Sequence, residues 1–310
     1  MNKIEFGDCR DTMRRWKQQG IKAQTCVTSP PYYGLRDYGH EGQIGLEETP
    51  EQYIAAMVEV FRCVWDVLED DGTLWLNIGD SYCGTGSKGD LVDPKNPEGR
   101  NGQAVSKTQK LVGYKSKDLI GIPWMLAFAL RADGWYLRQD IIWHKPNPMP
   151  ESVTDRCTKS HEYIFLLSKS HKYHFDHVAI KEPATTVENR PSGIVRDRVY
   201  DYDSKQKEMG RVRGGEETPE PTTRNRHSVW NVATKPYSGA HFAVFPTELI
   251  EPCILAGAPV GGIVLDPFMG SGTTAQVAQN LNRQYLGCEL NENYKSLQDQ
   301  RLRQLTLELA

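Results

Sequence analysis

Short apolar runs alternate with stretches of helical periodicity along most of the chain. Apolar residues recur near helical spacing between positions 53 and 68, which predicts a helix over 49–68 that starts at Pro50 and is ended by Asp71-Gly72. Weaker signals of the same kind predict further helices over 11–18, 122–132, 247–256, 275–281 and 293–309. Apolar runs of strand length occupy 3–6, 23–27, 73–78, 135–143, 162–168, 262–265 and 284–288.

Strands that alternate with helices form parallel sheets covered on both faces. The pattern therefore predicts an α/β fold with a mostly parallel, doubly wound, seven-stranded sheet. Ligands of such sheets bind at the carboxyl ends of the strands. Asp8, Ser29, Asp266 and Glu289 each follow or end a predicted strand, so we expect these four residues to converge.

Two segments interrupt the pattern. Residues 83–117 and 170–235 have no apolar periodicity, and both are mildly basic, with 7 Lys and Arg against 4 Asp and Glu in 83–118, and 12 against 10 in 170–235. The whole chain has a net charge of -3, so the rest of it is acidic. We interpret 83–117 as a flexible basic loop and 170–235 as an insertion into one domain made of 1–169 and 236–310. Local contact with a polyanion is compatible with this distribution, as are solvated surface loops.

The cysteines and the apolar runs restrict the class of protein. Seven scattered cysteines contain no C-x-x-C pair, which argues against a zinc site or a disulfide framework and favours free thiols in a reducing cytoplasm. The start of the chain lacks the apolar stretch of a secretion signal, and no apolar run approaches membrane-spanning length. We expect a cytoplasmic protein without a metal ion or a membrane partner.

A stiff tip follows the second predicted strand, in the sequence Thr28-Ser29-Pro30-Pro31-Tyr32. Each proline fixes its own φ and favours extended geometry in the residue before it. The tip presents one hydroxyl, backbone carbonyls and a flat ring, which suits a flat group with N–H donors. On its own, the tetrapeptide Ser29-Pro30-Pro31-Tyr32 fits an ordinary surface loop equally well.

A glycine-rich turn between a strand and a helix, Gly270-Ser271-Gly272, is typical of nucleotide sites. Glu289 ends the next strand, where a carboxylate can bind both ribose hydroxyls. Gly270 to Ala275 also fits the dinucleotide pattern, so an NAD-dependent oxidoreductase is the alternative. Asp266 at the start of the turn repels a pyrophosphate but attracts a cationic ligand, and the turn lacks the lysine of an ATP-binding loop. S-adenosylmethionine has a ribose, positive charge and no phosphate, and it fits better.

The sequence Asp-Pro-Phe-Met-Gly-Ser-Gly-Thr-Thr over 266–274, together with the tip, resembles the amino-group DNA methyltransferases of the beta group. The resemblance implies a class I, Rossmann-like methyltransferase fold, with Asp266 at the methionine part of the cofactor, Glu289 at the ribose and Asp8 at the adenine. Residues 241–246 resemble the family's segment that covers the cofactor. The implied cofactor-binding residues are Asp8, Thr28, Phe245, Pro246, Asp266, Phe268, Gly270, Ser271, Gly272, Thr273 and Glu289.

The expected chemistry explains the tip. An exocyclic amino nitrogen is a poor nucleophile, and it is reached only when its base is flipped out of the duplex. We expect the Ser29 hydroxyl and the Pro30 carbonyl to accept the two amino protons, Pro31 to keep the tip rigid, and Tyr32 only to stack on the flipped ring. No Pro-Cys pair occurs, which argues against methylation of a ring carbon. Within the family a serine at position 29 favours cytosine N4 over adenine N6, and both remain open.

The resemblance also implies partners. In this family the region that reads the DNA sequence lies where 170–235 lies here, and its basic residues are the expected DNA contacts. We expect double-stranded DNA as substrate in a prokaryotic or phage restriction-modification setting with association to the nucleoid, and we leave a homodimer and a cognate restriction endonuclease open. The expected DNA contacts are Arg190, Arg196, Arg198, Arg211, Arg213, Arg224 and Arg226.

Overall fold

The computed structural model describes residues 1–34, 39–40, 42–84, 111, 113–184, 223–235 and 245–308, with the side chains beyond 303 left out. The helices are α1 Cys9–Gln18, α2 Pro50–Val67, α3 Ile122–Ala132, α4 Thr247–Gly257, α5 Thr273–Asn280 and α6 Lys295–Glu308, the last preceded by the 3-10 turn η2 Glu292–Tyr294. The strands are β1 Lys3–Phe6, β2 Ala23–Thr28, β3 Leu68–Ile78, β4 Tyr136–His144, β5 His161–Ser168, β6 Glu182–Pro183, β7 Thr223–Arg224, β8 Val229–Asn231, β9 Ile263–Asp266 and β10 Gln284–Glu289.

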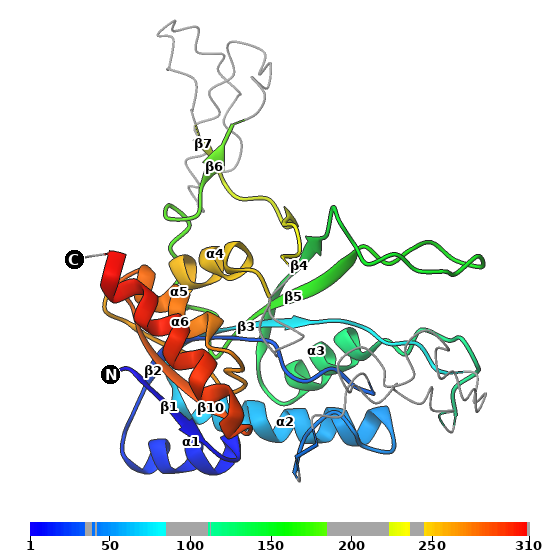
Figure 1. Cartoon of the computed structure of the whole chain (residues 1–310), viewed down its shortest axis with the longest axis horizontal. Helices are drawn as coiled ribbons and strands as arrows, with labels where there is room; N and C mark the ends of the chain where they lie inside the picture. Colours follow the sequence, from blue (N-terminus) through cyan, green and yellow to red (C-terminus); the bar gives the residue numbers. More distant parts are fainter. Residues whose placement is uncertain are drawn as a thin grey trace, which may run out of the picture.

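One sheet organises the described residues, with the strand order β1-β10-β9-β2-β3-β5-β4-β8 (Figure 1). Neighbours from β1 to β3 are parallel, β5 is antiparallel to both β3 and β4, and β8 is parallel to β4. The α/β class and the mostly parallel sheet are confirmed, but the number of strands is eight instead of the predicted seven. The extra strand, β8, is three residues long and lies inside the polar segment 170–235, where no apolar run announces it.

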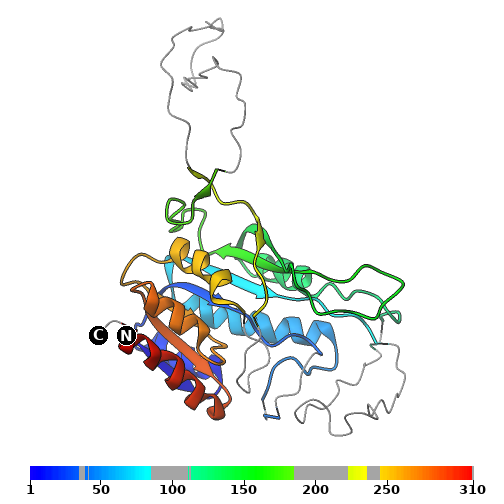
Figure 2. The same cartoon turned by 45° about the horizontal axis from the view of Figure 1, so that its top comes forward.

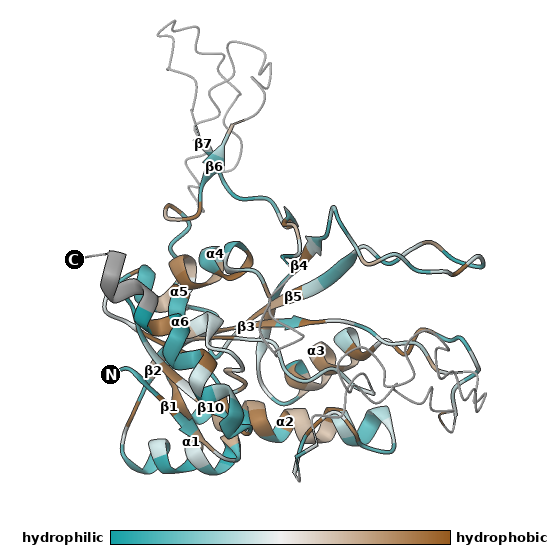
Figure 3. Ribbon diagram, viewed as in Figure 1, coloured by the Kyte–Doolittle hydropathy of each residue, from teal (hydrophilic) through white to brown (hydrophobic). Residues whose placement is uncertain are grey.

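Alternating side chains divide the core between the two faces of the sheet, as the period of two in a strand requires. In β3, Leu74 and Leu76 pack with α1, α2 and α3, whereas Trp75 packs with α4 and α5. The two groups of helices therefore lie on opposite sides of the sheet (Figure 2). Figure 3 shows hydrophobic residues along the central strands and mostly hydrophilic residues along α1 and the coloured part of α6.

The junction between α2 and β3 differs from its prediction. The helix starts as expected, with a capping box between Thr49 and Gln52 and Pro50 in the first turn. It ends at Val67, and β3 begins at once, so Asp71-Gly72 lies inside the strand and does not terminate the helix. The register of β3 against β2 shifts across this dipeptide, because Ala23 of β2 pairs with Leu68 and Thr25 pairs with Thr73. An irregularity of this kind absorbs the turn-forming residues within the strand.

Two general expectations can be compared with the structure. All seven cysteines are free, and only Cys157 is exposed. None of the described helices combines the length and the apolar composition that crossing a membrane requires. Of the two interrupting segments, residues 85–110, 112 and 185–222 lie outside the described residues.

The packing of α4 on the sheet yields a test of the fold. A Cβ added at Gly257, the last residue of α4, would lie 2.6 Å from Thr25 Oγ1 and 2.9 Å from Trp75 Nε1, both in the core. We expect Gly257→Ala to lower the free energy of unfolding by about 1–3 kcal/mol, the usual cost of overpacking. Chemical denaturation measures this change. In a Thr25→Ala background the Gly257→Ala substitution should cost less, and an equal cost in both backgrounds would show that the Thr25 contact is not its cause.

Candidate functional site

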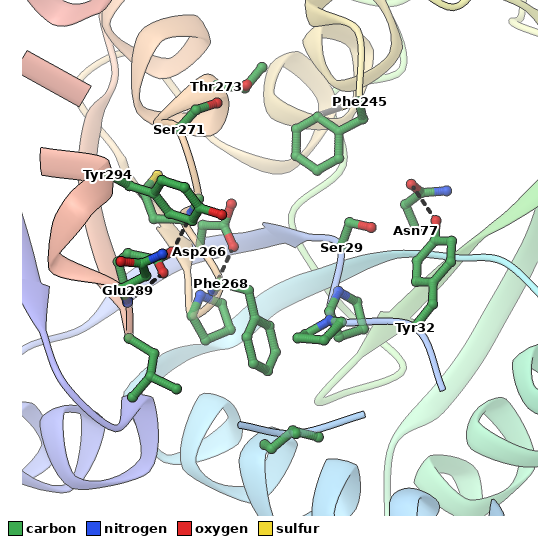
Figure 4. Close-up of a pocket in the computed structure, with 18 of the residues that line it drawn as sticks. Ser29, Tyr32, Asn77, Phe245, Asp266, Phe268, Ser271, Thr273, Glu289 and Tyr294 are labelled. Atoms are coloured by element: carbon green, nitrogen blue, oxygen red, sulfur yellow. Dashed lines mark hydrogen bonds between the residues drawn. The ribbon is translucent and has the colours of Figure 1, made fainter. Parts of the chain in front are cut away.

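A cavity of about 790 Å³ opens at the carboxyl ends of the parallel strands, within the size range of small-molecule sites. Figure 4 shows two groups of residues around it: Asp266, Glu289 and Tyr294 on one side, and Tyr32 and Asn77 on the other, with Ser29 between them. The predicted tip and the predicted glycine turn thus line the same cavity, although they are more than 230 residues apart in the sequence.

The tip is anchored from below by α2. The hydroxyl of Tyr53, a fully buried residue of that helix, donates to the Pro31 carbonyl at 2.9 Å. Ser29, Pro30, Pro31 and Tyr32 all line the cavity. A carbonyl held by a buried donor, next to two prolines with fixed φ, has little freedom to move.

The Tyr32 hydroxyl has a partner within the protein, and the expectation that this residue only stacks on the flipped base stays a prediction. Its hydroxyl donates to Glu162 Oε2 at 2.7 Å and lies 3.4 Å from Asn77 Oδ1. The ring lies against the chain after β3, where a Cβ on Gly79 would come within 2.6 Å of it. Burial, and then the negative charge of Glu162, raise the pKa of Tyr32 well above its ordinary value. The phenol is therefore neutral and acts as a donor.

Glu162 belongs to a polar group that sequence reasoning missed. Its other carboxylate oxygen forms an ion pair with Lys145, and Asn77 Nδ2 lies 3.4 Å from Oε2. All three residues line the cavity. Glu162 reaches it because β5 is antiparallel to its neighbours and so begins at the edge where they end. The sequence signal that could have indicated this group was Lys145. It directly follows β4, and the predicted site residues also lie at strand ends.

Asp266 joins the tip strand to the glycine turn. Its Oδ1 accepts hydrogen bonds from Thr28 Oγ1 at 2.6 Å and from the Phe268 amide at 3.0 Å, and its Oδ2 accepts one from Thr274 Oγ1 at 2.6 Å. Burial raises the pKa of Asp266 to about 6, while the Thr274 and Thr28 hydroxyls oppose the shift. A carboxylate offers about four lone-pair positions. Three are used by the protein, which leaves one on Oδ2.

Glu289 holds the other end of the turn. Its Oε2 accepts from the Gly270 amide at 2.7 Å and its Oε1 from the Asn291 amide at 2.8 Å. Gly270 and Gly272 have φ of 54° and 89°, a conformation that glycine adopts without strain. Burial raises the pKa of Glu289, and the Asn291, Gly270 and Leu290 amides act against it. Because a carboxylate can accept about four hydrogen bonds, Glu289 retains capacity toward the cavity.

The predicted cofactor-binding residues divide into two groups. Most of them line the cavity, whereas three do not: Thr28, Pro246 and Gly272. Thr28 instead holds Asp266, Pro246 caps α4, and Gly272 caps α5. The predicted residues that line the cavity are Asp8, Phe245, Asp266, Phe268, Gly270, Ser271, Thr273 and Glu289.

Asp8 lies at the cavity with its carboxylate already engaged. It caps α1 by accepting from the Arg10 amide at 2.8 Å, and the Arg10 guanidinium binds both of its oxygens. The Arg10 hydrogen bond is the main cause that lowers the pKa of Asp8. The structure therefore assigns this carboxylate a capping role, and its contact with adenine stays a prediction.

Most of the predicted DNA contacts lie outside the described residues, as do residues 241–244 of the predicted covering segment. The two described arginines both have protein partners. Arg224 Nε donates to Glu182 across the β6–β7 pair at 3.0 Å, and the Arg226 guanidinium lies 4.8 Å from the centre of the Trp230 ring. The predicted contacts outside the described residues are Arg190, Arg196, Arg198, Arg211 and Arg213.

The sequence matches one family of enzymes. A family model described as DNA methylase, of the N6/N4 methyltransferase type, matches residues 23–300. The chain is 49% identical to the Type II methyltransferase M.SmaI of Serratia marcescens, over 97% of this chain and 90% of that protein. It is 48% identical to the Type II methyltransferase M.Cfr9I of Citrobacter freundii, over 96% and 86%.

Solved structures agree on the fold. The PvuII DNA methyltransferase, titled cytosine-N4-specific, superposes with a TM-score of 0.61 at 15% identity, over 97% of this chain and 86% of that one. The complex of M1.HpyAVI with S-adenosylmethionine gives 0.56 at 17% identity, over 97% and 100%. None of these findings supports the NAD-dependent oxidoreductase alternative.

The hydrogen bond of the Tyr32 hydroxyl yields a test of the tip. Tyr32→Phe removes a donor to a carboxylate that is mostly buried, and such bonds contribute about 1.5–3 kcal/mol. We expect a loss of that size in the free energy of unfolding, measured by chemical denaturation. Tyr136→Phe is the control, because that ring is 45% exposed. Equal stability of the two variants would mean that the Glu162 contact contributes nothing.

Proposed function

The chain belongs to the family of S-adenosylmethionine-dependent DNA methyltransferases that act on amino groups, and we propose that its target is the N4 amino group of cytosine in double-stranded DNA. The observation that carries this proposal is the position of Ser29. It lies on the tip between the turn that would hold the cofactor and the Tyr32 ring that would hold the base (Figure 4).

The turn side of the cavity fits the cofactor. Of the residues that the structure describes, Ser271 has a buried hydroxyl that lines the cavity and makes no hydrogen bond within the protein, which is what a site for a polar ligand leaves. We assign the free position on Asp266 to the cofactor's ammonium group and Glu289 to its ribose hydroxyls. When bound, S-adenosylmethionine supplies a methyl group carried on a sulfonium.

The tip side holds the base in our proposal. Ser29 Oγ and the Pro30 carbonyl accept the two protons of the amino group, which favours a pyramidal nitrogen whose lone pair points at the cofactor. The Tyr53 bond to Pro31 keeps these acceptors in place before the base arrives. Tyr32 lies against one side of the base, and Glu162 fixes the direction of its ring.

Serine at position 29 supports cytosine over adenine. Ser29 resembles the residue at this position in the cytosine-N4 members of the family, whereas the adenine-N6 members more usually have aspartate there. A hydroxyl is neutral, and it can accept one amino proton without adding a third negative charge to those of Asp266 and Glu289. A carboxylate at this position would add that charge.

We assign sequence reading to residues 170–235. The described part of this segment is attached to the sheet, because β8 pairs with β4. The chain after β8 continues to Thr234 and Lys235, which line the cavity. The relatives are named Type II methyltransferases. On the basis of those names we propose that the protein has a cognate restriction endonuclease and that it associates with the nucleoid.

The target base is tested by incubating duplex DNA with the protein and isotopically labelled S-adenosylmethionine, followed by mass spectrometry of the nucleosides. We expect labelled N4-methylcytosine and no labelled N6-methyladenine. Ser29→Ala should give the same product at a lower single-turnover rate, by about tenfold to a hundredfold for one lost acceptor. Labelled N6-methyladenine would overturn the choice of base but not the class of reaction, and absence of any methylated base would overturn both.

The raised pKa of Asp266 predicts how cofactor binding depends on pH. In the free protein this carboxyl is mostly neutral at pH 5 and ionised at pH 7, because burial raises its pKa to about 6. A cationic ammonium prefers the ionised form, so the affinity for S-adenosylhomocysteine should rise as pH increases through 6, by about tenfold between pH 5 and 7. Calorimetry in two buffers should detect proton release near pH 6.

The control for this pH dependence is Asp266→Asn, which removes the titrating group. Where that variant folds, its affinity should be weak and independent of pH between 5 and 7. Proton release by the wild-type protein is the second measurement and does not rely on the variant. No proton release near pH 6, with binding intact, would show that Asp266 does not meet the ammonium group.

A further inference from the structure

The connection from β4 to β5 begins with a stiff rim beside the cavity. We call residues 145–150, Lys-Pro-Asn-Pro-Met-Pro, the proline rim. Three of its six residues are prolines with fixed φ. Asn147 ties the rim to Thr234, which follows β8, by two hydrogen bonds. Asn147 Nδ2 donates to the Thr234 carbonyl at 2.9 Å, and Asn147 Oδ1 accepts from the Thr234 amide at 2.9 Å. The rim is therefore held rigidly without being packed in the core.

Met149 is the unusual residue of the proline rim. Its side chain is 83% exposed, the largest exposure among the large apolar side chains of the described residues, and among those exposed side chains it alone lines the cavity. A side chain that lines a cavity and is almost fully exposed lies at its mouth. The flanking Pro148 and Pro150 fix the backbone on both sides, so the exposed methionine is presented outward from a stiff support.

The cavity mouth combines this apolar group with a cation. Lys235 also lines the cavity, its side chain is 65% exposed, and its ammonium group pairs with Glu248. Phosphates attract ammonium groups of this kind, whereas the uncharged side chain of methionine is not attracted to a phosphate. Apolar side chains, methionine among them, are instead inserted between bases by proteins that distort DNA.

We infer that Met149 enters the duplex at the place that the target base leaves, and that it fills the gap and contacts the remaining bases. The inference rests on the proposed function, since it requires a flipped base. Flipping costs unstacking and unpairing, and this cost is smallest for a base that is already mismatched. A thioether on a flexible side chain can adapt to the irregular gap and contact aromatic faces. Met149 therefore acts on the flipping step and touches neither the amino group nor the cofactor.

The experiment compares a paired target with an unpaired one. The substrates are duplexes that carry one site mapped from DNA methylated by the wild-type protein, with the target base either correctly paired or mismatched. We expect Met149→Ala to lower the single-turnover rate on the paired duplex by about tenfold, the order of magnitude for losing burial of such a side chain. On the mismatched duplex the rate should stay within about twofold of wild type.

Two further variants complete the test. Met149→Leu keeps an apolar side chain of similar volume and should retain most of the rate on the paired duplex. Val260→Ala is the matched control, because Val260 is 73% exposed and does not line the cavity, and it should change neither rate. A fluorescent 2-aminopurine at the target position reports flipping directly, and its signal on binding should fall for Met149→Ala alone.

The outcomes separate this inference from the proposed function. Failure of the wild-type protein to methylate any DNA, so that no site can be mapped, would overturn the proposed function itself. A wild-type protein that methylates both, with Met149→Ala unchanged on the paired duplex, would overturn the role of Met149. An equal loss on both duplexes, with unchanged 2-aminopurine fluorescence, would assign Met149 to general DNA contact instead of flipping, and would also overturn the inference.

Discussion

The site depends on the hydrogen bonds that the buried carboxylate of Asp266 accepts. Through Thr28 this carboxylate fixes the end of β2, from which the tip projects, and through Thr274 and the Phe268 amide it fixes the glycine turn. The Thr28 bond joins residues that are 238 positions apart in the sequence. Each of these bonds contributes about 1.5–3 kcal/mol when its acceptor is charged, and together they offset part of the cost of burying that charge, since burial still raises the pKa of Asp266 to about 6. The same group thus sets the distance between the two halves of the cavity and supplies negative charge to one of them.

Much of the fold and half of the site could be predicted from local sequence. Strand ends are marked by apolar runs that stop, and in a parallel sheet those ends meet at one edge, so Ser29, Asp266 and Glu289 converge as expected. The turn at Gly270 was equally predictable, because two glycines between a strand and a helix are typical of nucleotide sites, and both glycines do have positive φ. What made these predictions succeed is that topology turns a local signal into a shared position.

The remaining residues depend on pairings that no local pattern encodes. Glu162 reaches the cavity only because β5 is antiparallel, and the sequence of one strand does not state its direction. The Tyr32 hydroxyl could be assigned a partner only once Glu162 was placed. Asp71-Gly72 reads as a helix stop, yet an irregularity in β3 accommodates it. Arg224, predicted as a DNA contact, bonds to Glu182 through a strand pair two residues long.

Both walls of the cavity mouth obtain their stiffness in the same way. The tip has two adjacent prolines and one anchoring bond from Tyr53, and the proline rim has three prolines and the Asn147–Thr234 pair. Prolines reduce the freedom of the chain before binding, so less conformational entropy is lost when a ligand arrives. In such a site the substrate must supply the movement. A rigid mouth therefore agrees with an enzyme whose substrate, a base in a duplex, has to leave its stack before any chemistry can occur.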